Sequence, residues 1–343
     1  MAGCRAGPAE LAIVSDPLAK LAPVVRLAPA KLNLTLAVLG RRRDGFHDLH
    51  SVMVPLAFAD RLSLAVTPGD RRGSDSLHVE GIDAGPVADN LALRAVSEAR
   101  RAVGGGWPGG PGPTPPLSLR LDKRIPVAAG LGGGSADAAA ALDGALEAWD
   151  AELDTGRQLA VAARIGSDVP FFLAGGAALV EGRGERVQPL RGVLGSPGVL
   201  LVTPAVALST PAVFSAFAER RGRGDGSVRM SSEHLAGEVG AGLRTEDLLA
   251  RAGVLAAAND LLPAAAAVLP GLVPFRRALF RTLGRPVGLS GSGPTLWTLY
   301  PSEDDAAAAA TIVREALVAG TLPPLGVGDP TVVATTIPEG TRR

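Results

Sequence analysis

The stretch that decides the fold is PVAAGLGGGSADAAAAL, residues 126–142. Four of the five residues at 130–134 are glycine, and Ser135 and an alanine-rich run follow them. Glycine tolerates positive φ and lets a ligand approach the backbone closely. The helix predicted at 135–149 begins with free N–H groups and a positive dipole end. Together these features favour an anion site suited to the phosphates of a nucleotide. The alternative is a flexible connector before a helix.

Other phosphate-binding and catalytic motifs do not account for this segment. A Walker loop needs a lysine after its glycines, and none follows here. The dinucleotide fingerprint fails because Ser135 stands where its third glycine belongs. A second glycine-rich segment, GLSGSGP at 288–294, lacks the spacing of a serine hydrolase because Ser292 replaces the second glycine. The sequence has no HExxH, CxxC or EF-hand pattern.

Outward from the glycine run, helices and strands are predicted on both sides. Residues 31–39 alternate as one strand, with the side chains of Lys31 and Asn33 on the same face. Asp89 is the predicted N-cap of a helix over about 90–103. Further strands are expected at 117–125, as a pair within 171–182, and at 198–206, 294–300 and about 330–337, with a helix at 157–165. We expect a flexible leader at 1–25 and two domains, 26–190 and 191–340.

Composition narrows the class of protein. Of the 343 residues, 47% are hydrophobic and 20% charged, which is enough apolar material for a sizeable core. Basic and acidic residues number 34 each, so the zero net charge disfavours a nucleic-acid coat or a polybasic membrane binder. No apolar run is long enough to span a membrane, and the N-terminus lacks a signal layout, so a cytoplasmic location is expected. The single cysteine, Cys4, excludes an internal disulfide.

Six segments together resemble one superfamily. PVAAGLGGGSADAAAAL resembles the second motif of the GHMP kinases, and GLSGSGPTLW (288–297) resembles their third. APAKLNLTLAVLGRRRDGFHDLHSVMVPL (28–56) and IGSDVPFFLAGGAALVEGRGE (165–185) are similar to one branch, whose acceptor alcohol carries a cytidine diphosphate. DNL (89–91) and LDKRIP (121–126) match in the same order. The resemblance implies a two-domain α+β GHMP kinase fold with its active site in the interdomain cleft.

The resemblance also implies roles for individual residues. Asp168 is the expected catalytic base, and Lys31 is its expected partner, which keeps the carboxylate ionised. Of the 34 basic residues, only Lys20, Lys31 and Lys123 are lysines. In a chain that otherwise uses arginine, a lysine is more often found where the compact ammonium cannot be replaced by a guanidinium. ATP and Mg²⁺ are the implied cofactors, with Ser135 as a phosphate or metal ligand.

Two further groups of residues are assigned to the substrates. On the acceptor side, Phe46 is expected to stack on the cytosine and His47 to hydrogen-bond its edge, although Phe46 replaces the usual tyrosine. Asn33, Thr210 and Phe214 are assigned to the same side. The nucleotide is expected to contact Asn90, Leu91, Lys123, Pro126, Gly130, Gly132, Gly133, Gly134, Ser135, Gly291, Ser292 and Gly293.

The implied reaction is transfer of the γ-phosphoryl group of ATP to the 2-hydroxyl of 4-diphosphocytidyl-2-C-methyl-D-erythritol, a step towards isoprenoid precursors. Two alternatives remain at this point: another GHMP kinase, such as one for homoserine or mevalonate, and a non-catalytic nucleotide-binding protein on the same fold. The expected partner is a small-molecule substrate, with no nucleic acid or membrane, and the chain is expected to be a monomer or a homodimer.

Overall fold

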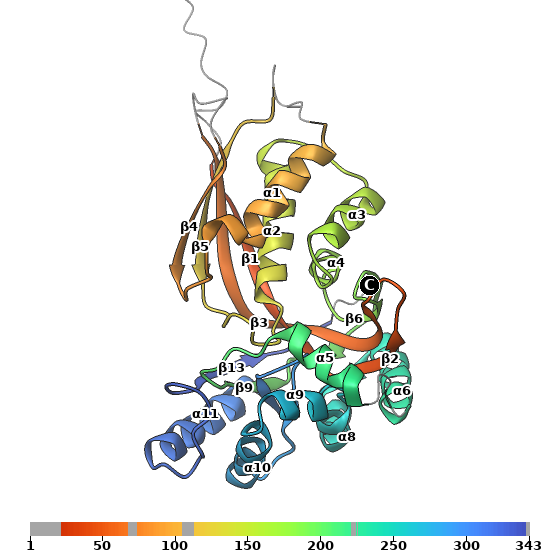
Figure 1. Cartoon of the computed structure of the whole chain (residues 1–343), viewed down its shortest axis with the longest axis vertical. Helices are drawn as coiled ribbons and strands as arrows, with labels where there is room; N and C mark the ends of the chain where they lie inside the picture. Colours follow the sequence, from red (N-terminus) through yellow and green to blue (C-terminus); the bar gives the residue numbers. More distant parts are fainter. Residues whose placement is uncertain (1–21, 68–73, 105–112, 221–223, 225, 341–343) are drawn as a thin grey trace, which may run out of the picture.

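The computed structural model describes residues 22–67, 74–104, 113–220, 224 and 226–340. Most of the predicted leader, residues 1–21, therefore lies outside the described residues. The two halves of the chain stack along the long axis of the molecule, with helices α1 (Leu91–Ala102) to α4 (Val169–Ala174) in the upper half of Figure 1. Strand β3 runs from the upper half towards the lower one.

The N-terminal half is organised around β3 (His47–Val66), a strand of 20 residues. Both β1 and β2 pair antiparallel with it, and the remaining strands follow the order β4-β5-β3-β6-β7. The other strands of this sheet are β1 (Val24–Asn33), β2 (Ala37–Arg41), β4 (Ser76–Gly81), β5 (Leu117–Lys123), β6 (Ala178–Gly182) and β7 (Arg186–Pro189). The length of β3 lets one strand carry residues to both halves of the molecule.

Helices cover one face of this sheet. They are α1 (Leu91–Ala102), α2 (Gly133–Ala148), α3 (Thr155–Ile165) and α4 (Val169–Ala174), preceded by a 3₁₀ turn at Val87–Asp89. Helix α2 is buried on almost every side, because its alanines let the sheet, α1 and α4 approach closely. A Cβ at Gly144 would lie 2.6 Å from Leu64 Cδ1. This packing fixes the N-terminus of α2, and with it the glycine run.

The C-terminal half has a four-stranded sheet with the order β11-β12-β9-β13. Its strands are β9 (Gly198–Thr203), β11 (Gly288–Leu289), β12 (Leu296–Tyr300) and β13 (Thr331–Thr336), and β8 (Val193–Leu194) pairs separately with β10 (Leu243–Arg244). The helices are α5 (Thr210–Arg220), α6 (Ser227–Ala241), α7 (Thr245–Ala250), α8 (Ala252–Ala257), α9 (Leu262–Val268), α10 (Leu272–Leu283) and α11 (Glu303–Val318).

The two halves share a hydrophobic core. Leu32 and Val54 of the first sheet belong to the same buried cluster as Leu201 and Trp297 of the second. The backbone N–H of Phe58 in β3 also donates a hydrogen bond of 2.9 Å to Thr335 Oγ1 in β13. Cavities between the halves are therefore lined by elements that are packed together.

The single strand predicted at 31–39 is wrong in one respect. Strand β1 ends at Asn33 and β2 begins at Ala37. The apolar side chains of this segment divide between two cores, with Leu32 in the shared core and Val38 in the core of the C-terminal half. The chain turns here because it passes from one half to the other.

Two further local predictions are also wrong. Residues 171–182 do not form a strand pair, because Pro170 lies in the first turn of helix α4, where its missing N–H costs nothing, and only 178–182 form a strand. The N-cap of α1 is Asn90, whose side chain accepts from the N–H of Ala92 at 2.9 Å, and not Asp89. The other predicted helices and strands are confirmed to within a few residues at each end.

Candidate active site

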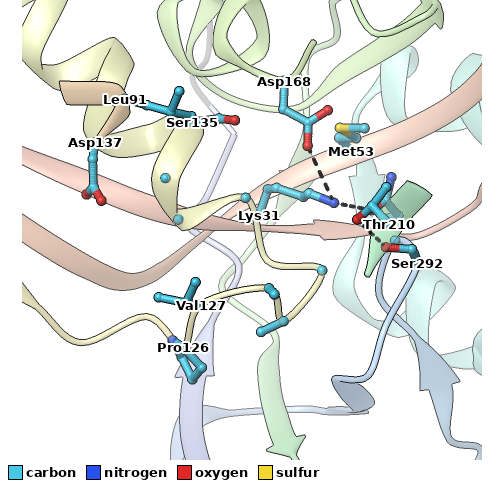
Figure 2. Close-up of a pocket in the computed structure, with 18 of the residues that line it drawn as sticks. Lys31, Met53, Leu91, Pro126, Val127, Ser135, Asp137, Asp168, Thr210 and Ser292 are labelled. Atoms are coloured by element: carbon cyan, nitrogen blue, oxygen red, sulfur yellow. Dashed lines mark hydrogen bonds and ion pairs between the residues drawn. The ribbon is translucent and has the colours of Figure 1, made fainter. Parts of the chain in front are cut away.

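A cavity of about 490 Å³ lies between the two halves. The N-terminal half contributes β1, the glycine run and the turn before α4, and the C-terminal half contributes the start of α5 and the loop after β11. Figure 2 shows the charged ends of Lys31 and Asp168 facing each other near the middle, with Thr210 and Ser292 on one side and Asp137 and Pro126 on the other. Its lining is polar at many points, as a site for a charged ligand requires.

The two glycine segments pack against each other, backbone to backbone. Gly130 and Gly132 have φ of 77° and 71°, values that favour glycine. A Cβ at Gly130 would collide with the carbonyl oxygen of Ser290. The hydroxyl of Ser290 in turn donates a hydrogen bond of 2.9 Å to the Gly130 carbonyl. Each segment thus needs the other to hold its shape.

Lys31 is a buried cation at the centre of the site. Its Nζ lies 3.9 Å from Asp168 Oδ2 and donates to Asn33 Oδ1 at 2.5 Å. Burial lowers the pKa of Lys31 from its usual value, and the charge of Asp168 opposes that shift. The side chain is packed tightly, because a Cβ at Gly132 would lie 3.0 Å from its Cγ and one at Gly291 would lie 3.1 Å from its Nζ.

Asp168 is the more accessible partner, with 31% of its side chain exposed. It is the residue immediately before helix α4, yet its carboxylate accepts no capping hydrogen bond there. The carboxylate is therefore available to the cavity. This arrangement places a hydrogen-bond acceptor beside a fixed positive charge, as general-base chemistry on an alcohol needs.

Asn33 is held in turn by a chain of buried hydrogen bonds. Its Nδ2 donates to Ser51 Oγ at 2.8 Å, and Ser51 Oγ donates to the carbonyl of Thr35 at 2.5 Å. On the other side of the cavity, the amide of Asn259 donates to the carbonyls of Leu289 and Gly291. These contacts orient Lys31 and the second glycine segment before any ligand is bound.

A buried cluster of three charges lies behind the first glycine segment. Lys123 Nζ donates to Asp60 and, at 2.7 Å, to Asp137 Oδ2. Burial raises the pKa of Asp137 to about 7, which the charge of Lys123 partly offsets. The predicted nucleotide contact of Lys123 is thus joined by two carboxylates that sequence reasoning did not assign. Asp60 lies in a mostly apolar segment, LAFADRLSL (56–64), and an acid in such a segment is the one signal in the sequence that points to it.

A second cavity of about 550 Å³ adjoins the first. Both are lined by Asp168, Thr210 and Phe214, so the carboxylate lies where they meet. The ring of His47 stacks on Phe214 with centroids 5.0 Å apart. Phe46 is half exposed, and the guanidinium of Arg183 lies 5.1 Å from its ring centroid.

Most predicted site residues line one of the two cavities. Phe46 and His47 line the second cavity, and the first is lined by Lys31, Asn33, Asn90, Leu91, Lys123, Pro126, Gly130, Gly132, Gly133, Gly134, Ser135, Gly291 and Ser292. The hydroxyls of Thr210 and Ser292 lie 2.8 Å apart (Figure 2). Gly293 differs, because it does not line the cavity, and a Cβ built on it would face Leu289 and Leu208. Sequence reasoning also missed Asn259 and Ser51. Each forms hydrogen bonds with site residues that are distant in sequence, so no local pattern predicts these contacts.

The residues that the structure describes hold no group of three or more His, Cys, Asp or Glu side chains arranged to bind a metal ion. Magnesium at phosphate sites usually takes only one or two protein oxygens and completes its shell with phosphates and water. The hydroxyl of Ser135, which lines the cavity at the start of α2, fits that donor set. None of the described helices has the length and apolarity needed to cross a bilayer.

Comparison with known proteins places this geometry in a family. The model for the N-terminal domain of GHMP kinases matches residues 90–176, and the model for their C-terminal domain matches 241–319. A homoserine kinase from Cytophaga hutchinsonii shares the fold, with a TM-score of 0.65 at 16% identity, over 94% of this chain and 96% of that one.

More similar relatives carry one common name. The 4-diphosphocytidyl-2-C-methyl-D-erythritol kinase of Pelotomaculum thermopropionicum is 37% identical over 80% of this chain and 88% of its own. That of Streptomyces avermitilis is 39% identical over 82% and 89%. A crystal structure of 4-(cytidine 5'-diphospho)-2C-methyl-D-erythritol kinase has a TM-score of 0.66 at 33% identity and covers 92% of this chain and all of that one. The chain therefore belongs to the 4-diphosphocytidyl-2-C-methyl-D-erythritol kinase family of the GHMP kinases.

Proposed function

We propose that this protein transfers the γ-phosphoryl group of ATP to the 2-hydroxyl of 4-diphosphocytidyl-2-C-methyl-D-erythritol, with Asp168 as the base and Lys31 as its partner. The observation that carries the proposal is the position of Asp168 where the two cavities meet, 3.9 Å from the Lys31 ammonium. One cavity then holds ATP and the other the acceptor. The reacting oxygen and phosphorus would meet at this carboxylate.

Proton transfer follows from the local charges. The Asp168 carboxylate accepts the proton of the attacking hydroxyl, and the Lys31 ammonium stabilises the negative charge that develops on the oxygen. Lys31 is fixed by Asn33 and by packing against the glycine segments, so its charge needs little reorganisation during the reaction. Phosphoryl transfer depends mainly on such positioning and charge stabilisation.

The first cavity orients ATP along its length. The phosphates lie at the N-terminus of α2, where Gly132, Gly133 and Gly134 offer backbone N–H groups, with the γ-phosphate nearest Lys31. The nucleoside lies towards Asn90, Leu91 and Pro126. Ser135 would hold a magnesium ion, which when bound offsets phosphate charge.

The second cavity takes the acceptor. Phe46 and the stacked pair of His47 and Phe214 supply aromatic surface for a cytosine ring. Burial, with a smaller contribution from Arg41, lowers the pKa of His47, so its ring is neutral at pH 7 and offers one donor and one acceptor. A homoserine or mevalonate acceptor has no base to occupy this surface.

The domain boundary, the cellular location and the oligomeric state belong to the same proposal. Two domains meet near residue 190, where the first sheet has ended at Pro189 and the second has yet to begin at Gly198. The protein acts in the cytoplasm as a monomer or homodimer on a small-molecule substrate. Limited proteolysis and light scattering test the boundary and the oligomeric state.

The reaction itself is tested by ADP release over a panel of alcohols. The purified chain is incubated with ATP and magnesium, and with the cytidyl acceptor, homoserine or mevalonate in turn. The proposal expects turnover with the cytidyl compound at a kcat/KM far above that with the other two. Equal or preferred turnover of homoserine or mevalonate would contradict it.

A further inference from the structure

Arg183 is a cation in the acceptor cavity that the roles assigned above do not use. It lies in the turn between β6 and β7, and its side chain lines the cavity with Asp168, Phe46 and His47. Among the described residues, its guanidinium makes one hydrogen bond, from Nη2 to the carbonyl of Ala163 at 3.0 Å, and has no carboxylate within 4.0 Å. A guanidinium carries five N–H donors, so most of them are left for a ligand.

The turn that carries Arg183 is held against the catalytic turn. Gly184 has φ of 123°, and a Cβ there would lie 2.6 Å from the carbonyl oxygen of Ser167, the residue before Asp168. The backbone N–H of Arg183 also donates to Glu185 Oε2 at 2.6 Å. The backbone of this turn is therefore held close to Asp168, and the guanidinium is held by its bond to Ala163 and its contact with the Phe46 ring.

The same guanidinium covers one face of Phe46. Its carbon lies 5.1 Å from the ring centroid, within the range of a cation–π contact. The Phe46 ring is half exposed, which leaves other parts of its surface open to the cavity. A cytosine stacked there would place the phosphates that follow its ribose within the same cavity as the arginine.

The charge of the cavity is consistent with an anionic ligand. Four charged side chains line it: Arg41, Arg183, Asp168 and Glu219. Because Asp168 faces the Lys31 ammonium, the remaining three leave an excess of one positive charge. Neither arginine has a carboxylate within 4.0 Å among the described residues. A ligand with a diphosphate would supply the missing negative charge.

We infer that Arg183 binds the diphosphate group of the acceptor through its free N–H donors while its planar face positions the Phe46 ring against the base. This inference rests on the proposed function for the identity of the acceptor. Arginine suits such a site because its fork matches phosphate oxygens and its face stacks on aromatic rings. Arg183 is thereby a specificity-determining residue, which selects acceptors that carry a diphosphate.

The test compares ligands that differ only in the diphosphate. Calorimetry measures the affinity of cytidine diphosphate and of cytidine for the parent chain, Arg183→Gln and Arg183→Lys. Loss of charge-assisted hydrogen bonds should weaken the binding of cytidine diphosphate to Arg183→Gln by about 10- to 100-fold. The binding of cytidine should weaken much less, and the affinity of Arg183→Lys for cytidine diphosphate should lie between those of the parent chain and Arg183→Gln. In turnover assays, KM for the acceptor should rise while kcat and KM for ATP stay near parental values.

Arg186→Gln is the matched control, because Arg186 lies on the same hairpin with 62% of its side chain exposed and does not line the cavity. It should leave all these values unchanged. Equal weakening of cytidine and cytidine diphosphate in Arg183→Gln would show that the residue only supports Phe46, and unchanged binding of both would show no role; either result overturns the inference. If the parent chain fails to phosphorylate the acceptor while the diphosphate preference still depends on Arg183, the proposed function fails and this inference stands.

Discussion

Two adjacent glycines at the start of α2 should respond to the same substitution in opposite ways. A Cβ at Gly134 would meet only Leu91 Cδ1 at 3.8 Å, and Gly134 and Leu91 both line the nucleotide cavity. A Cβ at Gly133 would lie 2.9 Å from both Ile125 Cγ2 and Lys123 Nζ, which are buried. A methyl group at 134 therefore enters the ligand space, whereas one at 133 enters the protein core.

Gly134→Ala should make the protein slightly more stable and bind ATP less well. Alanine is favoured over glycine in helices by up to about 1 kcal/mol, and by less near a terminus. We therefore expect the melting temperature to rise by roughly 1–2 °C. The methyl group displaces a phosphate from the backbone N–H groups, and losing one such bond costs about 1.5–3 kcal/mol, or roughly 10- to 100-fold in Kd.

Gly133→Ala should instead lower the melting temperature, because inserting a methyl group into a packed core costs about 1–3 kcal/mol. Gly237→Ala is the control, since Gly237 lies within α6, its Cβ would meet nothing within 4 Å, and it does not line the cavity. It should raise stability and leave ATP binding unchanged. Calorimetry with a non-hydrolysable ATP analogue and thermal melts measure both quantities. An unchanged Kd in Gly134→Ala would refute the placement of the phosphates.

Four other outcomes are expected. Asp168→Asn should lower kcat by about 10²–10⁴-fold, the usual worth of a general base, with the Kd of an ATP analogue unchanged; turnover within threefold of the parent would remove Asp168 from the mechanism. Lys31→Arg should reduce kcat nearly as much as Lys31→Ala, because Gly132 and Gly291 leave no room for a guanidinium, whereas near-parental activity would show that the reaction does not need the compact ammonium. Lys123→Met should destabilise the fold by about 3–5 kcal/mol in chemical denaturation, since Asp60 and Asp137 lose their buried cation; a change below about 1 kcal/mol would mean that the cluster contributes little. Burial lowers the pKa of His47 in the folded chain from 6.5, so the unfolded chain binds a proton at a higher pH than the folded chain does. The stability that neutral His47 contributes is therefore present above pH 6.5 and is lost as the pH falls through the folded pKa. His47→Gln should make the melting temperature depend less on pH in that range.

The sequence predicted the parts of the site that lie within single motifs. The phosphate-binding character of the glycine segments and the shared strand face of Lys31 and Asn33 follow from residue types and spacing, whereas the role of Asp168 is what the resemblance to the GHMP kinases implies. The structure places these residues on the walls of adjoining cavities. Local patterns also gave most helices and strands, because apolar periodicity determines which face of an element is buried.

Contacts between distant segments could not be predicted in this way. Lys123 pairs with Asp60, 63 residues earlier, and Asn259 holds a loop 30 residues later. The strand predicted over 31–39 breaks because its two ends belong to different cores, which depends on the packing of the whole chain. The sequence predicts a strand over part of α4 because its phenylalanines suit either structure, and the turn before the helix packs against Gly184, which is distant in sequence.

Phosphorus NMR of the product tests the central claim most directly. The parent chain, ATP, magnesium and 4-diphosphocytidyl-2-C-methyl-D-erythritol are combined, and Asp168→Asn serves as a matched protein. We expect a new phosphate monoester resonance coupled to carbon 2 of the methylerythritol, stoichiometric with ADP, and its near absence over the same period with Asp168→Asn. A phosphate on another hydroxyl, ADP formed without a phosphorylated acceptor, or equal product from Asp168→Asn would contradict it.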